Sequence, residues 1–79
     1  MTAAAPAVVV FTRHAEQRAA ERDIPLRDVA DVLLAGHARR RRNPGDADWL
    51  LRERGITIAY DWPDRDDAMT AVVISVWRE

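Results

Sequence analysis

The sequence predicts an α+β domain: a short strand, a helical hairpin, and then a three- to four-stranded, mostly antiparallel sheet. Three observations support this prediction. Two stretches between Thr12 and Gly36 have helical spacing, residues 56–62 alternate in polarity, and Met69 to Trp77 is apolar on both faces. We therefore expect two helices to pack on one face of a twisted sheet.

Composition favours one small domain. The chain has 79 residues, of which 48% are hydrophobic and none is cysteine, so a compact core is possible but a disulfide or a thiolate zinc site is not. No apolar run approaches the roughly 20 residues of a membrane-spanning helix. We expect a single cytoplasmic domain over residues 1–79, ordered over about residues 7–78.

Charge is distributed unevenly along the chain. The formal net charge is −1, but residues 1–43 carry 8 arginines and 5 acidic residues, whereas residues 44–79 carry 4 arginines and 8 acidic residues. All 12 basic residues are arginine. Arginine usage of this kind is explained either by a GC-rich genome or by a need for bidentate phosphate contacts, and both explanations stay open.

The N-terminal half predicts a strand and two helices. Ala7 to Phe11 is rich in β-branched residues, and Thr12 is a suitable N-cap for a helix that follows it. Asp23 to Pro25 ends this helix, because proline cannot donate its amide. Gly36 is expected to terminate the second helix as its C′ residue. The residues expected on the inward faces are Phe11, Ala15, Ala19, Leu26, Val29, Ala30 and Leu33.

The C-terminal half predicts the rest of the sheet. His37 to Arg42 is compatible with a strand or an exposed loop, and Asn43 to Asp46 is a turn. Trp49 to Arg54 and Ile56 to Trp62 are expected to form a hairpin, the second strand of which is half-buried. Pro63 to Asp67 is an acidic loop before the central last strand.

One stripe on the first helix is a candidate catalytic site. His14, Arg18 and Arg22 are spaced by four, so they lie along one helix face. Histidine can act as a general acid or base near neutral pH, and two guanidinium groups can hold a phosphate. The alternative is structural: His14 caps or packs at the helix start, and Arg18 pairs with Glu21 or with carboxylates of the sheet.

The arginine run is a candidate binding surface. Arg39, Arg40, Arg41 and Arg42, together with Arg78, could bind nucleic acid or an acidic partner protein. In a strand, alternate arginines face opposite ways, so only two would act together. The alternative is an edge strand whose charges prevent pairing with another sheet.

Two further groups of residues are candidates for binding roles. Four aromatic residues could stack on bases, although in so small a core we expect most of them to be packing residues: Trp49, Tyr60, Trp62 and Trp77. His14 and His37 lack the ligand spacing of a metal site, so neither a metal nor a cofactor is predicted.

The helical hairpin also resembles a known family. The pattern F-T-x-H-A-x-x-R-x-x-E-R-x-I, followed by V-x-x-V-L-x-x-G, is similar to that of domain-of-unknown-function family 4258. Val72 to Trp77 resembles the closing strand V-V-I-x-V-W of that family, and the match covers about Val10 to Trp77. The residues that carry the helical pattern are Phe11, Thr12, His14, Ala15, Arg18, Glu21, Arg22, Ile24, Val29, Val32, Leu33 and Gly36.

The resemblance implies a topology and a function. The topology of that family is similar to that of RelE/ParE-like and BrnT-like bacterial toxins, many of which cleave RNA. It implies a metal-independent endoribonuclease centred on His14, Arg18 and Arg22, neutralised by an antitoxin. Two alternatives stay open: a non-enzymatic module that binds a protein or nucleic acid through its arginines, and a mobile-element inhibitor that acts by occlusion. A homodimer is compatible with each of them.

Overall fold

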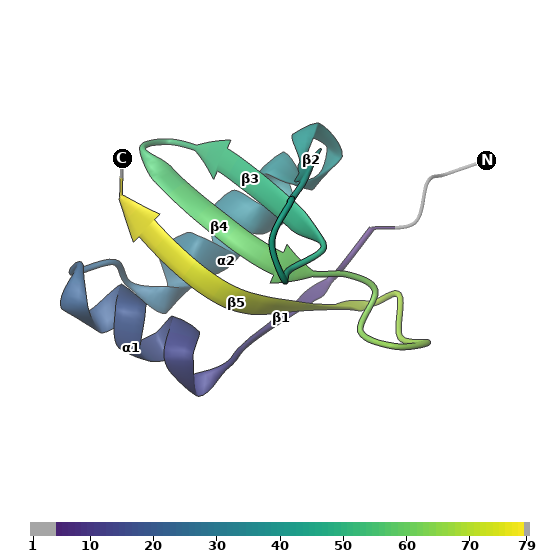
Figure 1. Ribbon diagram of the computed structural model, residues 1–79, viewed down its shortest axis with the longest axis horizontal. Helices are drawn as coiled ribbons and strands as arrows, with labels where there is room; N and C mark the ends of the chain where they lie inside the picture. Colours follow the sequence, from purple (N-terminus) through teal and green to yellow (C-terminus); the bar gives the residue numbers. More distant parts are fainter. Residues whose placement is uncertain (1–4, 79) are drawn as a thin grey trace.

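The computed structural model describes residues 5–78 and confirms the α+β class predicted from the sequence (Figure 1). In chain order the elements are β1 (Val8–Phe11), α1 (Arg13–Glu21), α2 (Leu26–Gly36), the 3₁₀ helix η1 (His37–Arg39), β2 (Arg41–Arg42), β3 (Trp49–Glu53), β4 (Ile56–Asp61) and β5 (Thr70–Arg78). The sequence predicted order from about residue 7 onward, and residues 1–4 lie outside the described residues. None of the helices in residues 5–78 is long and apolar enough to cross a membrane.

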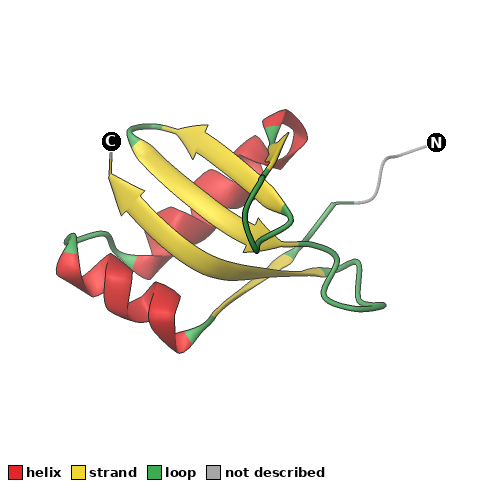
Figure 2. Ribbon diagram, viewed as in Figure 1, coloured by secondary structure: helices red, strands yellow, loops and turns green. Residues whose placement is uncertain are grey.

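The strands form one mixed sheet in the order β1-β5-β4-β3-β2. β1 pairs in parallel with β5, and all other neighbouring strands are antiparallel. Both helices lie on one face of the sheet (Figure 2), where α1 contacts β5 and β1 and α2 contacts β3 and β4. The predicted layer arrangement is therefore confirmed, and the short first strand forms one edge of a five-stranded sheet.

The predicted inward faces of the helices form the core. Ala15 and Ala19 are 0% and 1% exposed, and their small side chains allow α1 to lie close to β5. α2 contributes the larger side chains of Val29 and Leu33, both completely buried against the sheet. Burying a side chain of this size completely contributes about 1.5–3 kcal/mol, a large share of the stability of so small a domain.

The middle strand β4 is more deeply buried than its alternating sequence predicted. Its apolar face packs under the helices as expected, but Thr57 and Ala59 on the other face are also only 0% and 6% exposed. Thr57 lies in register between Arg52 of β3 and Trp77 of β5, so large neighbours flank a small side chain. The prediction of a half-buried strand is wrong because it ignored these cross-strand neighbours.

Thr12 begins α1 as the sequence predicted. Its Oγ1 accepts a hydrogen bond of 3.1 Å from the Ala15 amide and donates one of 3.3 Å to the Ile74 carbonyl of β5. A single hydroxyl group therefore caps the helix and attaches its first turn to the sheet. In contrast, Pro25 at the N-cap of α2 makes no side-chain cap hydrogen bond.

Gly36 does not terminate the second helix in the predicted way. It is the last α-helical residue, with φ −101° and ψ −4°, and the chain continues directly into η1. A Cβ atom at Gly36 would lie 2.9 Å from Oε1 of Glu53 and 3.0 Å from Cδ2 of Leu51. The glycine therefore allows α2 to approach β3 closely, and a left-handed helix cap is not involved.

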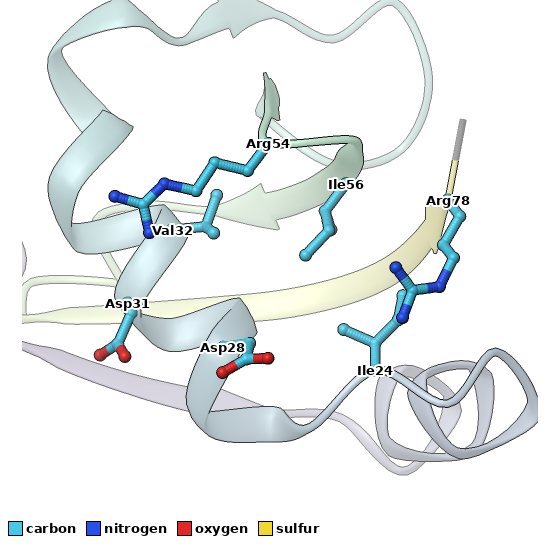
Figure 3. Close-up of a pocket in the computed structure, with 7 residues that line it drawn as sticks. All are labelled: Ile24, Asp28, Asp31, Val32, Arg54, Ile56 and Arg78. Carbon is cyan, nitrogen blue, oxygen red and sulfur yellow. The ribbon is translucent and has the colours of Figure 1, made fainter.

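The predicted hairpin between β3 and β4 is confirmed. Arg54 and Gly55 join the two strands with φ values of 54° and 74°. Positive φ at both central residues is the pattern of a type I′ turn, which matches the twist of the strands that it connects. The turn also places the Arg54 side chain at the end of the sheet, beside α2 (Figure 3).

Replacing Thr12 by alanine is expected to lower the free energy of unfolding by about 1–2 kcal/mol, because the helix cap and the bond to Ile74 are both lost. Thr12→Ser keeps the hydroxyl group and should recover most of this stability. Urea unfolding followed by circular dichroism measures both variants. Equal stability of the two variants would contradict the role assigned to the hydroxyl group.

Candidate nucleic-acid interface

The stripe predicted as a catalytic site lies on the surface of α1. His14 is exposed, and its side chain makes no hydrogen bond or ion pair within residues 5–78. Nη1 of Arg18 donates to Oε1 of Glu21 at 3.1 Å, and Nη1 of Arg22 is 4.0 Å from the same oxygen. The structural alternative for Arg18 is therefore observed. Exposed ion pairs of this kind contribute at most about 1 kcal/mol, so both arginines can exchange Glu21 for another anion.

The arginine run begins with a residue that is already paired. Arg39 lies in η1, and its guanidinium donates to Oε1 of Glu53 from Nε at 2.7 Å and also from Nη2. The same Nη2 donates to the Ala35 carbonyl at 3.2 Å. The charge of Arg39 is thus partly compensated, although 62% of its side chain is exposed.

Arg40 lies against two aromatic rings. Its Cζ atom is 4.1 Å from the ring centroid of Trp49 and 5.1 Å from that of Trp62, distances at which ring faces attract a cation. Nη1 donates to the His37 carbonyl at 3.0 Å, and Nε is buried without a hydrogen-bond partner in the described part of the chain. Both tryptophans pack against the core, as expected, and in addition they hold a cation.

Arg41 and Arg42 form the whole of β2, and both are exposed. Arg41 is in register with Leu50 and Arg42 with Trp49, so the two side chains point to opposite faces, as predicted for alternate arginines. Arg42 lies 5.2 Å from the ring centroid of Trp49. Arg41 faces a cavity of about 410 Å³. This cavity is lined by Arg39, Arg41, Leu50, Arg52 and Glu53.

A buried histidine–tyrosine pair lies beneath the arginine run. His37, whose surroundings the sequence left open, is only 4% exposed in η1. A hydrogen bond of 2.8 Å joins its Nδ1 to the Tyr60 hydroxyl group. Its ring also meets that of Trp62 edge to face, with centroids 4.5 Å apart. Nε2 of His37 is buried and has no partner among residues 5–78.

Burial keeps this pair uncharged. Desolvation, and secondarily the charge of Arg40, lower the pKa of His37 from its ordinary value of 6.5. Burial raises the pKa of Tyr60 to about 12, although Arg40 opposes this shift. Both groups are therefore neutral at neutral pH, and Arg40 supplies the charge of the aromatic cluster. The aromatic cluster consists of His37, Arg40, Trp49, Tyr60 and Trp62.

The predicted site residues fall in separate places. α1 packs on β5 and β1, whereas β2 lies three strands from β5, about 14 Å across the sheet. The structure therefore does not bring His14 together with Arg39–Arg42. Arg78, predicted as a binding residue, donates from Nε to the Arg22 carbonyl and from Nη2 to the Asp23 carbonyl, both at 3.0 Å.

Sequence analysis missed the aromatic cluster, although its members were visible separately. Trp49, Tyr60 and Trp62 were assigned to packing, and His37 was considered only as a metal ligand. The available signal was a histidine two positions before an arginine run in a chain with few aromatic residues. That signal does not identify Tyr60 as the partner, because the two residues are 23 positions apart.

No family model, curated protein or solved structure matches this chain. Within residues 5–78, no group of three or more histidine, aspartate or glutamate side chains could hold a metal ion.

The stability of the protein is expected to fall between about pH 7.5 and about pH 5.5. Folding lowers the pKa of His37, so neutral His37 contributes to the free energy of unfolding. This contribution is complete above pH 6.5 and is lost as the pH falls through the pKa of the folded state. Urea unfolding at the two pH values measures the loss. His37→Gln should reduce it, whereas His14→Gln, which changes an exposed histidine outside the cluster, should retain it. The same loss in all three proteins would contradict this assignment.

Proposed function

We propose that this protein binds RNA through the arginine edge of its sheet, defined as Arg39–Arg42 with Arg52. One observation carries the proposal: Arg41 and Arg42 are exposed on the edge strand, next to Arg40, which is already stacked on aromatic rings. Guanidinium groups bind phosphate oxygens through paired hydrogen bonds, and the RNA backbone presents a row of such phosphates.

The two exposed arginines reach different faces of the sheet. Arg41 faces the cavity of about 410 Å³, and Arg42 lies on the side of Trp49. Neither residue forms an ion pair within the described residues. Single-stranded RNA that crosses this edge would therefore contact one arginine on each side of β2. Neither arginine would first have to give up an ion-pair partner.

The net charge of −1 does not prevent local binding. Asp64, Asp66 and Asp67 lie in the loop between β4 and β5, outside β2 and β3. The Asp67 carboxylate already accepts hydrogen bonds from the Met69 amide and the Thr70 hydroxyl group. At physiological ionic strength, exposed charges are screened beyond about 8 Å, so the local surface determines the attraction to phosphate.

Replacing Arg41 and Arg42 together by alanine should weaken the binding of labelled single-stranded RNA by about tenfold or more, because two phosphate contacts are lost. Fluorescence anisotropy at several salt concentrations measures this effect. The slope of log affinity against log salt concentration should fall by about 1.4.

The matched control replaces Arg13 and Arg27, two exposed arginines on the helices, by alanine. This variant removes the same charge and should bind RNA almost as tightly as the original protein. Equal losses in the two double variants, or no binding by the original protein, would refute the proposed interface.

A toxin-like, metal-independent ribonuclease is the second candidate, and the exposed position of His14 favours it. In such a reaction the 2′-hydroxyl group attacks phosphorus, and the 5′-oxygen leaves with a proton. His14 could transfer one of the protons, while Arg18 and Arg22 stabilise the phosphate charge. The resemblance to family 4258 and to RelE/ParE-like toxins supports this candidate and implies a neutralising partner protein.

Purified protein incubated with total RNA in EDTA tests this candidate. We expect cleavage by the original protein and a loss of at least about 100-fold in His14→Ala, because one proton-transfer group is removed. Circular dichroism confirms that the variant is folded. Cleavage that persists in His14→Ala, or a folded protein that cleaves neither free nor ribosome-bound RNA, would exclude the mechanism without affecting the proposal of RNA binding.

A further inference from the structure

A second cavity lies outside the arginine edge, between α2, the β3–β4 turn and the end of β5 (Figure 3). Its volume is about 320 Å³. It is lined by Ile24, Asp28, Asp31, Val32, Arg54, Ile56 and Arg78. Of these residues, only Arg78 was predicted from the sequence to be a binding residue. The cavity shares no residue with the arginine edge.

This cavity has an acidic wall and a basic wall. Asp28 and Asp31 are exposed residues of α2, less than one helical turn apart. Figure 3 shows Arg54 extending from the β3–β4 turn and Arg78 from β5. No ion pair joins these four side chains within residues 5–78. Both walls are therefore able to receive a ligand that carries both charges.

The guanidinium of Arg78 is held in place by the protein itself. Its Nε and Nη2 donate to the carbonyl groups of Arg22 and Asp23, each at 3.0 Å. These bonds use part of its five N–H donors, and Nη1 remains for a ligand. A charged group that is already oriented loses less conformational entropy when it binds an anion.

The floor between the two walls is apolar. Ile24, Val32 and Ile56 are 4%, 3% and 6% exposed, and Figure 3 shows Ile56 pointing into the space between the two arginines. Ligand pockets have volumes of about 300–1,000 Å³, so this cavity is at the small end of the range. A molecule of the size of an amino acid fits within this volume.

We propose that this cavity binds an ω-amino carboxylate, a molecule with an ammonium group and a carboxylate joined by a short aliphatic chain. Asp28 and Asp31 bind the ammonium group, Arg54 binds the carboxylate, and the aliphatic chain covers the apolar floor. The same chemistry occurs in a free amino acid and in the C-terminal lysine of a peptide. The proposal does not depend on RNA binding.

Methyl NMR tests the proposal, because Ile24, Val32 and Ile56 report on the floor directly. The protein is titrated with 6-aminohexanoate and with hexylamine and hexanoate, which each lack one charged end. We expect all three methyl groups to shift with 6-aminohexanoate, and the two analogues to bind at least about tenfold more weakly, since each loses one set of charged hydrogen bonds.

A peptide titration distinguishes the two sources of the ligand. The peptide Ala-Ala-Ala-Lys is compared with its C-terminal amide and with 6-aminohexanoate. Tighter binding of the free peptide assigns the cavity to a protein C-terminus, and tighter binding of 6-aminohexanoate assigns it to a free small molecule. In both cases the amide, which lacks the carboxylate, should bind at least about tenfold more weakly than the free peptide.

Matched variants identify the walls. Arg54→Gln and Asp28→Asn should each weaken binding of 6-aminohexanoate by about tenfold. Arg65→Gln is the control for the first, because Arg65 also has a positive φ, 57° against 54° for Arg54. Glu16→Gln is the control for the second, since both acids lie in the first turn of a helix. Unshifted methyl signals, equal binding of the three probes, or equal losses in the control variants would overturn the proposal.

Discussion

The hydrogen bond between His37 and Tyr60 is the constraint on which the arginine edge depends. It joins the first residue after α2 to the middle strand of the sheet at 2.8 Å. Burying two polar side chains costs less free energy when they are uncharged and hydrogen-bonded to one another. The shifted pKa values keep both groups uncharged, and the hydrogen bond satisfies Nδ1 of His37. Because His37 is fixed in this way, Arg40 follows at a position where its guanidinium reaches Trp49. A buried polar contact thus determines where surface cations lie.

The order of the strands separates the cationic side chains into surfaces with different neighbours. The stripe on α1 lies beside β5 and contains Glu21, which reduces its attraction for anions. The arginine edge lies at the other end of the sheet, where Arg39 pairs with Glu53 but Arg41 and Arg42 of β2 form no ion pair among residues 5–78. This difference is the reason for proposing RNA binding at the edge ahead of catalysis at His14. In the sequence, the stripe on α1 and the arginine run both lie within residues 1–43, the half with a positive net charge. The sequence therefore could not show that they form separate surfaces.

The exclusive use of arginine also has a structural explanation. Arg40 stacks on aromatic rings, Arg78 donates from two different nitrogens to two carbonyl groups, and Arg39 donates twice to Glu53. A planar group with five N–H donors suits each of these geometries better than the compact ammonium group of lysine. Phosphate recognition and genome composition are therefore not the only reasons for finding arginine at these positions.

The sequence by itself determined the two α-helices and most of the strands, because their signals are local, but it left η1 and β2 open. A hydroxyl residue at Thr12 begins a helix, and Arg54 with Gly55 forms a tight turn, from interactions within a few residues. It also indicated which residues carry charge. The tertiary structure decided the role of Gly36, which is small because β3 passes close to it, and the burial of His37, whose partner is 23 positions away. Contacts between distant parts of the chain leave no periodic pattern in the sequence, so only the folded chain shows which arginines are held in place by other residues and which are exposed without an ion pair.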